Sequence, residues 1–216
     1  MKYKYIFLDL DGTLTDSKEG ILNCIKYALS KFGIEENDNN KLMKYAGPPL
    51  YVSFTTFNGF DDEKAKKAIE YYRERFATIG IFENRAYDGA EELLQKLTAA
   101  GRILVLATSK PLVYAEQIVK KYRLRPYLKF ISGAELDGTR DSKTEVIEYA
   151  IKKTKITDRS KIIMVGDRRQ DILAAKECGI TSCGVRFGYA EEGELENAGA
   201  DYIAEDFVEL YKILIQ

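Results

Sequence analysis

The spacing of apolar residues changes along the chain. After a first apolar run, Tyr5-Ile6-Phe7-Leu8, the segment from about 16 to 81 repeats apolar residues three and four positions apart. That periodicity predicts helices, with no strand between them. From Gly89 onwards, short continuous apolar runs alternate with stretches of helical spacing. The chain therefore divides into an all-helical segment and a strand–helix alternation.

The first segment contains four predicted helices. One runs from Ser17 to Phe32 and precedes Gly33, a residue typical of helix ends. A short helix precedes Gly47-Pro48-Pro49, where a glycine and two prolines require an extended turn. The other two are predicted at 50–57 and from Asp61 to about 79, the latter opening with acids that favour a helix N-terminus.

The alternating segment predicts a sheet. Apolar runs too short for helices stand at 5–8, 103–107 and 161–165, and shorter strands are predicted at 129–132, 181–185 and 200–203. Strands of this kind, separated by helices, are typical of a parallel sheet covered on both faces. We expect Pro111 in the first turn of the helix after the second strand. The predicted fold is α/β: a doubly wound, Rossmann-like core formed by 1–15 and 82–216, with a small helical domain, 16–81, inserted after the first strand.

The composition narrows the function. The 216 residues carry 33 basic and 34 acidic side chains with no basic stripe, so we expect no nucleic-acid polymer as a partner. No apolar run reaches membrane-spanning length and no signal peptide precedes the first strand, so we expect a cytoplasmic protein without a membrane partner. The three cysteines lack CxxC spacing, which favours buried thiols in a reducing compartment.

The absence of histidine excludes several kinds of catalytic site. It removes Ser-His-Asp triads, Cys-His pairs and nearly all zinc hydrolase sites. Catalysis must then use carboxylates, lysines, hydroxyls and a hard, oxygen-preferring cation, for which Mg²⁺ is the natural candidate.

The candidate chemistry begins directly after the first strand, in Asp9-Leu10-Asp11-Gly12-Thr13-Leu14-Thr15. A buried strand that ends in carboxylates needs a cation or hydrogen-bond donors nearby, because desolvating an unpaired charge is costly. Gly12 allows a tight turn with a backbone amide free to face an anion. This stretch therefore predicts a bound metal and a phosphate.

Two more strands end in polar residues. Thr108 and Ser109 follow the second strand, and Asp167 and Asp171 follow the strand at 161–165. The carboxyl ends of parallel strands meet at one edge of the sheet, where ligands gather. Lys143 stands in the first turn of a predicted helix, where a cation opposes the helix dipole by roughly 0.3–1 kcal/mol unless an anion is bound there.

Taken in order, these motifs resemble the phosphatase branch of the haloacid dehalogenase superfamily. The stretch from Asp9 to Thr15 is similar to its nucleophile motif, and Thr108, Lys143 and Gly166-Asp167-Arg168-Arg169-Gln170-Asp171 follow as its other motifs. The inserted helices match the superfamily's small helical cap. Within the superfamily, the chain is most similar to phosphoglycolate phosphatase-like and 5'-nucleotidase-like members.

The resemblance implies a role for each residue of the first motif. Asp9 is the expected nucleophile, which forms an aspartyl-phosphate and also holds Mg²⁺. Asp11 is the expected general acid, which protonates the leaving group, then activates water, and gives its backbone carbonyl to the metal. The alternatives are a turn-capping aspartate at position 9 and a turn-forming one at position 11.

The other motifs imply phosphate and metal binding. Thr108, the amide of Ser109 and Lys143 are expected to bind phosphoryl oxygens. Asp167 is the expected direct Mg²⁺ ligand, with Asp171 acting through a water molecule or bracing Lys143. The alternatives are helix capping for Ser109 and Asp167, a solvated or capping role for Asp171 and a solvated lysine at position 143.

Several further residues carry weaker expectations. Arg140 is a candidate phosphate contact, and Arg168 and Arg169 are expected to make ion pairs that steady the acidic loop. The segment 47–50 is expected to face the active site, against the alternative of a rigid turn without substrate contact. Tyr45, Tyr51 and Lys18 are candidate substrate contacts for which structural roles are the preferred interpretation.

The predicted function is a Mg²⁺-dependent phosphatase for small phosphorylated metabolites: phosphoglycolate, nucleoside monophosphates or sugar phosphates. The alternatives are a phosphomutase on the same core and a non-catalytic phosphate-binding protein. Thr13 disfavours the mutase, in which an aliphatic residue is common, and Asp11 disfavours a dehalogenase, which dispenses with that acid. We expect a monomer or a small homo-oligomer.

Overall fold

The computed structural model describes all 216 residues, which form two compact units. The core unit comprises Met1–Asp16 and Ala86–Gln216, and the helical unit comprises Ser17–Arg85. Each unit has its own set of elements and its own buried side chains.

The core unit is built on one six-stranded parallel sheet with the strand order β5-β4-β1-β6-β7-β8. A second sheet consists of only two short strands, β2 and β3. The strand bounds are β1 Tyr5–Leu8, β2 Thr15–Asp16, β3 Arg85–Ala86, β4 Ile103–Pro111, β5 Leu128–Ala134, β6 Ile162–Gly166, β7 Thr181–Val185 and β8 Tyr202–Ala204.

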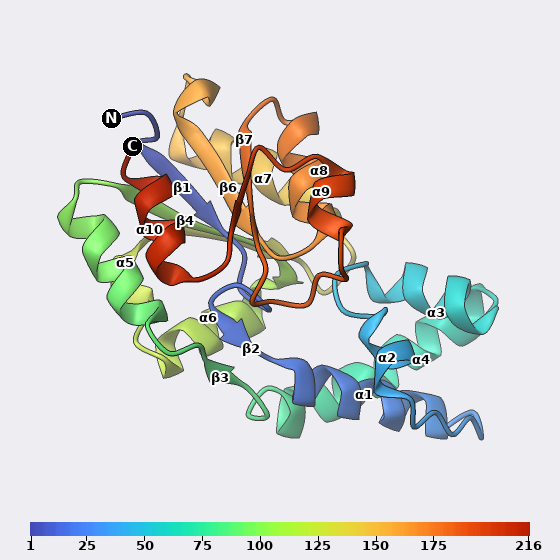
Figure 1. The fold of residues 1–216 in the computed structure, drawn as a ribbon. Helices are drawn as coiled ribbons and strands as arrows, with labels where there is room; N and C mark the ends of the chain where they lie inside the picture. Colours follow the sequence, from blue (N-terminus) through green and yellow to red (C-terminus); the bar gives the residue numbers. More distant parts are fainter. The chain divides into compact units, whose positions relative to one another are not determined.

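The strand order makes the sheet doubly wound. From β1 the chain moves outward to β4 and β5, then returns to the other side of β1 and continues through β6, β7 and β8. Because parallel crossovers are right-handed, this reversal places the connecting helices on opposite faces. Helices α5 and α6 pack on β4, while α7 packs on β4 and β5 and α8 on β6 and β7 (Figure 1). The predicted α/β fold class is confirmed.

The helices of the core unit follow the predicted alternation. The apolar faces of α7 and α8 cover a cluster centred on Phe7, Val105 and Met164, all with no exposed surface. Removing a buried phenylalanine such as Phe7 costs about 3–5 kcal/mol, so this cluster supplies much of the unit's stability. The helix bounds are α5 Ala90–Ala99, α6 Leu112–Lys121, α7 Lys143–Thr154, α8 Arg169–Glu177, α9 Glu194–Ala198 and α10 Phe207–Leu214, with short 3₁₀ turns at η2 Arg125–Tyr127 and η3 Arg159–Lys161.

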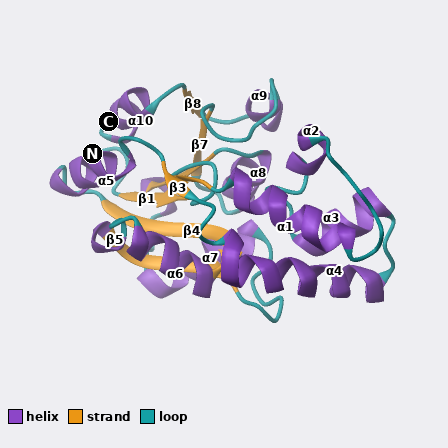
Figure 2. Cartoon of the chain, turned by 90° about the horizontal axis from the view of Figure 1, so that it is seen from below, coloured by secondary structure: helices purple, strands orange, loops and turns teal.

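The helical unit contains four α-helices and one π-helical turn. Figure 2 shows α1 and α4 as the long helices of this unit. Asp61 caps α4 by accepting a hydrogen bond from the amide of Lys64. Phe54 is fully buried and stacks on Phe60 with ring centroids 6.1 Å apart. The bounds are α1 Lys18–Ser30, α2 Asn39–Met43, α3 Leu50–Asn58, α4 Asp62–Arg75 and η1 Phe76–Gly80.

One local prediction is wrong. Pro111 was expected in the first turn of a helix, but it ends β4 and precedes α6, with an extended backbone at ψ 131°. The strand continues through Thr108, Ser109 and Lys110 before the helix begins. A proline is compatible with both positions, because its ring restricts φ but not ψ.

The cysteines lie in the interior of the protein. Cys24, Cys178 and Cys183 are all buried and form no disulfide, and burial raises the pKa of Cys178 and of Cys183 to about 12. Such thiols are unreactive near neutral pH.

Every helix falls short of the length and apolar character that crossing a bilayer requires.

Candidate active site

The site is formed where β1 and β6 end side by side. Leu8 pairs with Val165 in the parallel register, and the amide of Asp9 continues the ladder by donating to the Val165 carbonyl at 2.9 Å. Asp9 and Asp167 each follow the end of their strand, so the register alone makes them neighbours. The sheet thus joins residues that are far apart in the sequence.

Both carboxylate oxygens of Asp9 have partners. Oδ1 accepts from the amide of Leu10 at 2.8 Å, and Oδ2 lies 2.9 Å from Nζ of Lys143. Burial nevertheless raises the pKa of Asp9 to about 6, and the charge of Asp171 adds to this, while Lys143 and the hydroxyl of Thr108 oppose it. Asp9 remains mostly ionised at neutral pH, which a carboxylate nucleophile requires.

Lys143 stands between two carboxylates. Its Nζ lies 2.9 Å from Asp9 and 2.8 Å from Oδ1 of Asp171, and it donates to the carbonyl of Ala107 at 3.2 Å. Burial by itself lowers the pKa of Lys143, but the charges of Asp171 and Asp9 reverse this, and the pKa is raised. Ser142 and Glu145 form the predicted capping box around it at the start of α7. The ammonium is therefore charged and held in place.

Asp167 is the most deeply buried carboxylate. It has no exposed surface, accepts from the hydroxyl of Thr13 at 3.2 Å, and accepts from the amide of Tyr189 at 2.8 Å. Burial, together with the charges of Asp171 and Asp9, raises its pKa well above the usual range. Two neutral donors do not compensate a charge in this position.

Gly12 allows Asp167 to lie this close to the first motif. Its φ is +79°, and a Cβ at this position would lie 2.1 Å from Oδ2 of Asp167. Both observations require glycine, since other residues are strained at this φ and any side chain would displace the carboxylate.

The donor set fits a divalent cation. Oxygens of Asp9, Asp167 and Asp171 lie within 4.8 Å of one another, and a single ammonium, that of Lys143, faces them. Carboxylate oxygens are the ligands that Mg²⁺ prefers, and a cation would relieve the burial that raises the pKa of Asp167. Asp171 is already engaged, since Oδ1 pairs with Lys143 and Oδ2 accepts from the amide of Arg168 at 3.1 Å.

The end of β4 brings the hydroxyl residues to the same edge of the sheet. Thr108 is buried, hydrogen-bonds Asp9, and accepts from the amide of Lys110 at 3.2 Å. Ser109 follows it and is partly exposed. Asp11 extends from the first motif, and its Oδ2 lies 2.5 Å from Nζ of Lys110. The structure thus brings together Asp9, Asp11, Thr108, Lys143, Asp167 and Asp171.

Two residues that contribute to the site were not predicted from the sequence. Lys110 pairs with Asp11, although its place in the chain suggested only the end of a strand. Tyr189 gives its amide to Asp167 and its hydroxyl to Asp16 at 3.1 Å, from a loop without recognisable pattern. The tripeptide Thr108-Ser109-Lys110 carried the only local signal for Lys110, a cation after two hydroxyl residues.

The arginines serve structural roles. Arg168 forms an ion pair with Glu194 at 2.8 Å, as predicted for the acidic loop, whereas Arg169 contributes its backbone amide to the same Glu194. Arg140 pairs with Glu135, and its guanidinium lies 3.9 Å from the ring centroid of Tyr149. Arg140 is therefore held by partners outside the site.

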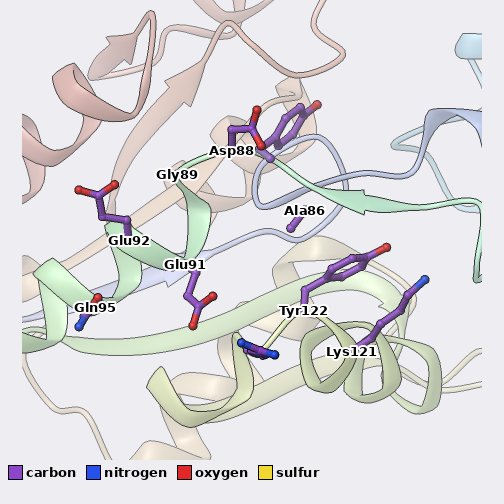
Figure 3. Close-up of a pocket in the computed structure, with 10 residues that line it drawn as sticks. Ala86, Asp88, Gly89, Glu91, Glu92, Gln95, Lys121 and Tyr122 are labelled. Carbon is purple, nitrogen blue, oxygen red and sulfur yellow. The ribbon is translucent and has the colours of Figure 1, made fainter.

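A separate groove of the core unit contains none of these residues. It has a volume of about 600 Å³ and lies between the start of α5 and the end of α6. Figure 3 shows Glu91, Glu92 and Gln95 along α5, with Lys121 and Tyr122 across from them. Charged side chains of both signs line the groove, with Glu91 and Glu92 on one side and Lys121 on the other.

The chain is similar to proteins of one family. Residues 5–185 match the family described as haloacid dehalogenase-like hydrolase. A 5'-nucleotidase of Pseudomonas aeruginosa is 39% identical over 214 residues, which cover 99% of this chain and 96% of that protein. A predicted phosphatase from Clostridium acetobutylicum has a solved structure with a TM-score of 0.96 and 45% identity, covering 100% of this chain and 99% of that one.

Two more distant relatives carry different names. The tyrosine-protein kinase PtkA of Mycobacterium tuberculosis is 33% identical over 184 residues, which cover 85% of this chain but only 62% of that protein. A phosphoglycolate phosphatase of Vibrio parahaemolyticus is 25% identical over 219 residues, covering 98% of this chain and 96% of that protein.

Proposed function

Because the chain belongs to the haloacid dehalogenase-like hydrolase family and is a phosphoric monoester hydrolase, we propose that it hydrolyses small phosphorylated metabolites through an aspartyl-phosphate on Asp9. The observation that supports this best is the placement of Asp9 itself. Its carboxylate is buried at a strand end, next to an ammonium on one side and Asp167 on the other. The predicted resemblance to this family is confirmed by the match over residues 5–185.

The proposed reaction has two halves. In the first, a carboxylate oxygen of Asp9 bonds to phosphorus, the bond from phosphorus to the ester oxygen breaks, and Asp11 gives that oxygen a proton. In the second, water attacks the aspartyl-phosphate and loses a proton to Asp11, which releases phosphate and regenerates Asp9. Thr108, the amide of Ser109 and Lys143 bind the phosphoryl oxygens and stabilise the charge that develops there.

The carboxylates of the site support Mg²⁺ as the proposed cofactor. Asp9, the backbone carbonyl of Asp11 and Asp167 would hold Mg²⁺, with Asp171 bracing Lys143 or binding through water. When bound, the cation offsets the repulsion between the anionic nucleophile and the phosphate. Asp167 is preorganised for this role, since Thr13 and the amide of Tyr189 orient its two oxygens.

The names of the relatives support a proposed substrate class. We place nucleoside 5'-monophosphates first, since the more similar 5'-nucleotidase aligns along nearly the whole chain. Phosphoglycolate and sugar phosphates are the other candidates. The helical unit is proposed as the cap domain that restricts substrate size.

Phosphate release from a panel of phosphomonoesters tests the proposal. We expect hydrolysis of p-nitrophenyl phosphate and of nucleoside monophosphates with Mg²⁺, and loss of activity after chelation. Asp9→Asn should lower turnover on the order of 10⁴-fold or more, because no other group forms the covalent intermediate. Asp88→Asn, at an exposed carboxylate, is the matched control.

Two outcomes contradict the proposal. Full activity of Asp9→Asn excludes the covalent intermediate on that residue. Isomerisation of a sugar phosphate without release of inorganic phosphate identifies a phosphomutase instead.

A further inference from the structure

The end of β4 is irregular. Thr108 pairs with Gly133 and Pro111 pairs with Ala134, so two residues of β4 lie between positions that are consecutive in β5. Ser109 and Lys110 are therefore extra residues in the ladder. Bulges of this kind redirect side chains and are frequent next to active sites.

Gly133 allows the bulge to pack against β5. A Cβ at this position would lie 2.8 Å from the carbonyl oxygen of Lys110 and 2.9 Å from the amide nitrogen of Leu112. Both atoms belong to the backbone, so a side chain at 133 would move the segment that carries Lys110. The bulge and the glycine therefore determine together where this lysine points.

Lys110 points at Asp11. Its side chain is only 5% exposed, and Nζ lies 2.5 Å from Oδ2 of Asp11. The other oxygen, Oδ1, is buried and makes no hydrogen bond. The two oxygens of one carboxylate thus have different surroundings, one bound to a cation and the other without a partner.

Stability alone does not explain a buried lysine here. Replacing a buried ion pair with apolar side chains of similar volume is often neutral for folding, because the gain in attraction barely offsets the desolvation of two charges. A group that must exchange protons, in contrast, benefits from having one defined oxygen for the transfer.

We propose that Lys110 is a positioning residue for proton transfer by Asp11, an inference that rests on the proposed phosphatase function. Because Nζ holds Oδ2 and Oδ1 has no partner, we assign the transferred proton to Oδ1. When the bond from phosphorus to the ester oxygen breaks, that oxygen keeps the electron pair and takes the proton from Oδ1. In the second half, Oδ1 takes a proton from the attacking water.

Leaving-group dependence tests this proposal. kcat/KM reports the steps up to release of the alcohol, and general acid catalysis matters most when the departing oxygen is strongly basic. Lys110→Met should lower kcat/KM for phenyl phosphate by about 10²-fold, the lower end of typical general-acid contributions, but that for p-nitrophenyl phosphate by less than about tenfold. Lys110→Arg should recover part of the loss, because it restores a donor.

Three comparisons make the result decisive. Asp11→Asn should show the same selective loss, and the double variant with Lys110→Met should lose little more, because the two residues act as a unit. Gly133→Ala should reproduce the selectivity by shifting the backbone of Lys110. Lys120→Met, which removes an exposed lysine of α6, should leave kcat/KM unchanged for both esters.

Failure of the inference and failure of the proposed function give different results. If Lys110→Met lowers kcat/KM equally for both esters while its thermal midpoint matches that of the native protein, the positioning role is excluded and the phosphatase remains. If the native protein releases no phosphate from either ester, the proposed function itself fails.

Discussion

Both units of this protein contain acidic side chains that are at least partly buried, but the surroundings shift their pKa values in opposite directions. In the core unit, burial raises the pKa of Asp9 to about 6 and that of Asp167 further, despite the ammonium of Lys143 nearby. In the helical unit, two hydrogen bonds from Arg75 hold the pKa of Glu83 below its usual range, at N–O distances of 2.7 and 2.8 Å.

The difference lies in how completely each charge is compensated. The guanidinium of Arg75 donates to both carboxylate oxygens of Glu83. Glu83 also accepts a hydrogen bond from Asn23 at 3.1 Å, so its charge is compensated within the helical unit. The carboxylates of the core unit outnumber their one ammonium. This excess of carboxylates over cations is one reason why the pKa of Asp167 is raised, and a bound cation would offset it.

The largest expected effect comes from removing that ammonium. Lys143→Met leaves Asp9 and Asp171 without their cation, and breaking a buried pair in this way costs about 3–5 kcal/mol in free energy of unfolding. Urea denaturation at neutral pH measures this loss. Lys152→Met, at an exposed lysine of the same helix, is the control, and equal stability of the two variants would show that the cluster is not charged.

Metal binding should produce the next largest change. If Mg²⁺ compensates the carboxylates, a concentration about 100 times its Kd stabilises the protein by about 2.7 kcal/mol. We expect a higher thermal midpoint with Mg²⁺ for the native protein and no increase for Asp167→Asn. An equal increase in both would place the cation elsewhere.

Breaking the pair in the helical unit should cost less. Arg75→Met removes both hydrogen bonds to a partly exposed carboxylate, and we expect a loss of about 1–3 kcal/mol at neutral pH. Since the folded pKa of Glu83 is lowered, its contribution is complete above the unfolded value of about 4.3 and is lost as the pH falls through the folded value. The difference in free energy of unfolding between the native protein and Arg75→Met should therefore become smaller below about pH 4.3. Urea denaturation at a series of pH values measures it. A difference that does not depend on pH would assign the loss to packing of the arginine stem.

The smallest effect is expected at an exposed pair of the same unit. Lys66 and Asp62 lie one helical turn apart on α4, and both side chains are more than half exposed. Solvent and salt screen such a pair, so Lys66→Met should leave the thermal midpoint unchanged within error. If Lys66→Met lowered the thermal midpoint as much as Arg75→Met does, the exposed pair would be as stabilising as the partly buried pair of Arg75 and Glu83.

Local patterns accounted for most of the fold and for the candidate residues. The apolar runs predicted the order of strands and helices, and the capping spacing at Ser142 predicted the start of α7. Asp9 and Asp167 were assigned to one site because strand ends of a parallel sheet share an edge, and Lys143 was added because the family resemblance implied it. The wrong position of Pro111 has the same origin as the missed Lys110, since the sequence does not reveal how far β4 continues past Thr108.

What the sequence determined by itself was the set of chemical groups: carboxylates after two strands, hydroxyls after a third, and no histidine to take their place. These depend on residue identity and on periodicity within a few residues. Only the tertiary structure decided how the charges are paired, because each pairing joins separate strands and helices. It showed Lys143 between Asp9 and Asp171, and it showed Lys110 on one oxygen of Asp11. Those distances depend on strand register and on a bulge that packs against a glycine, which arise only when the sheet assembles.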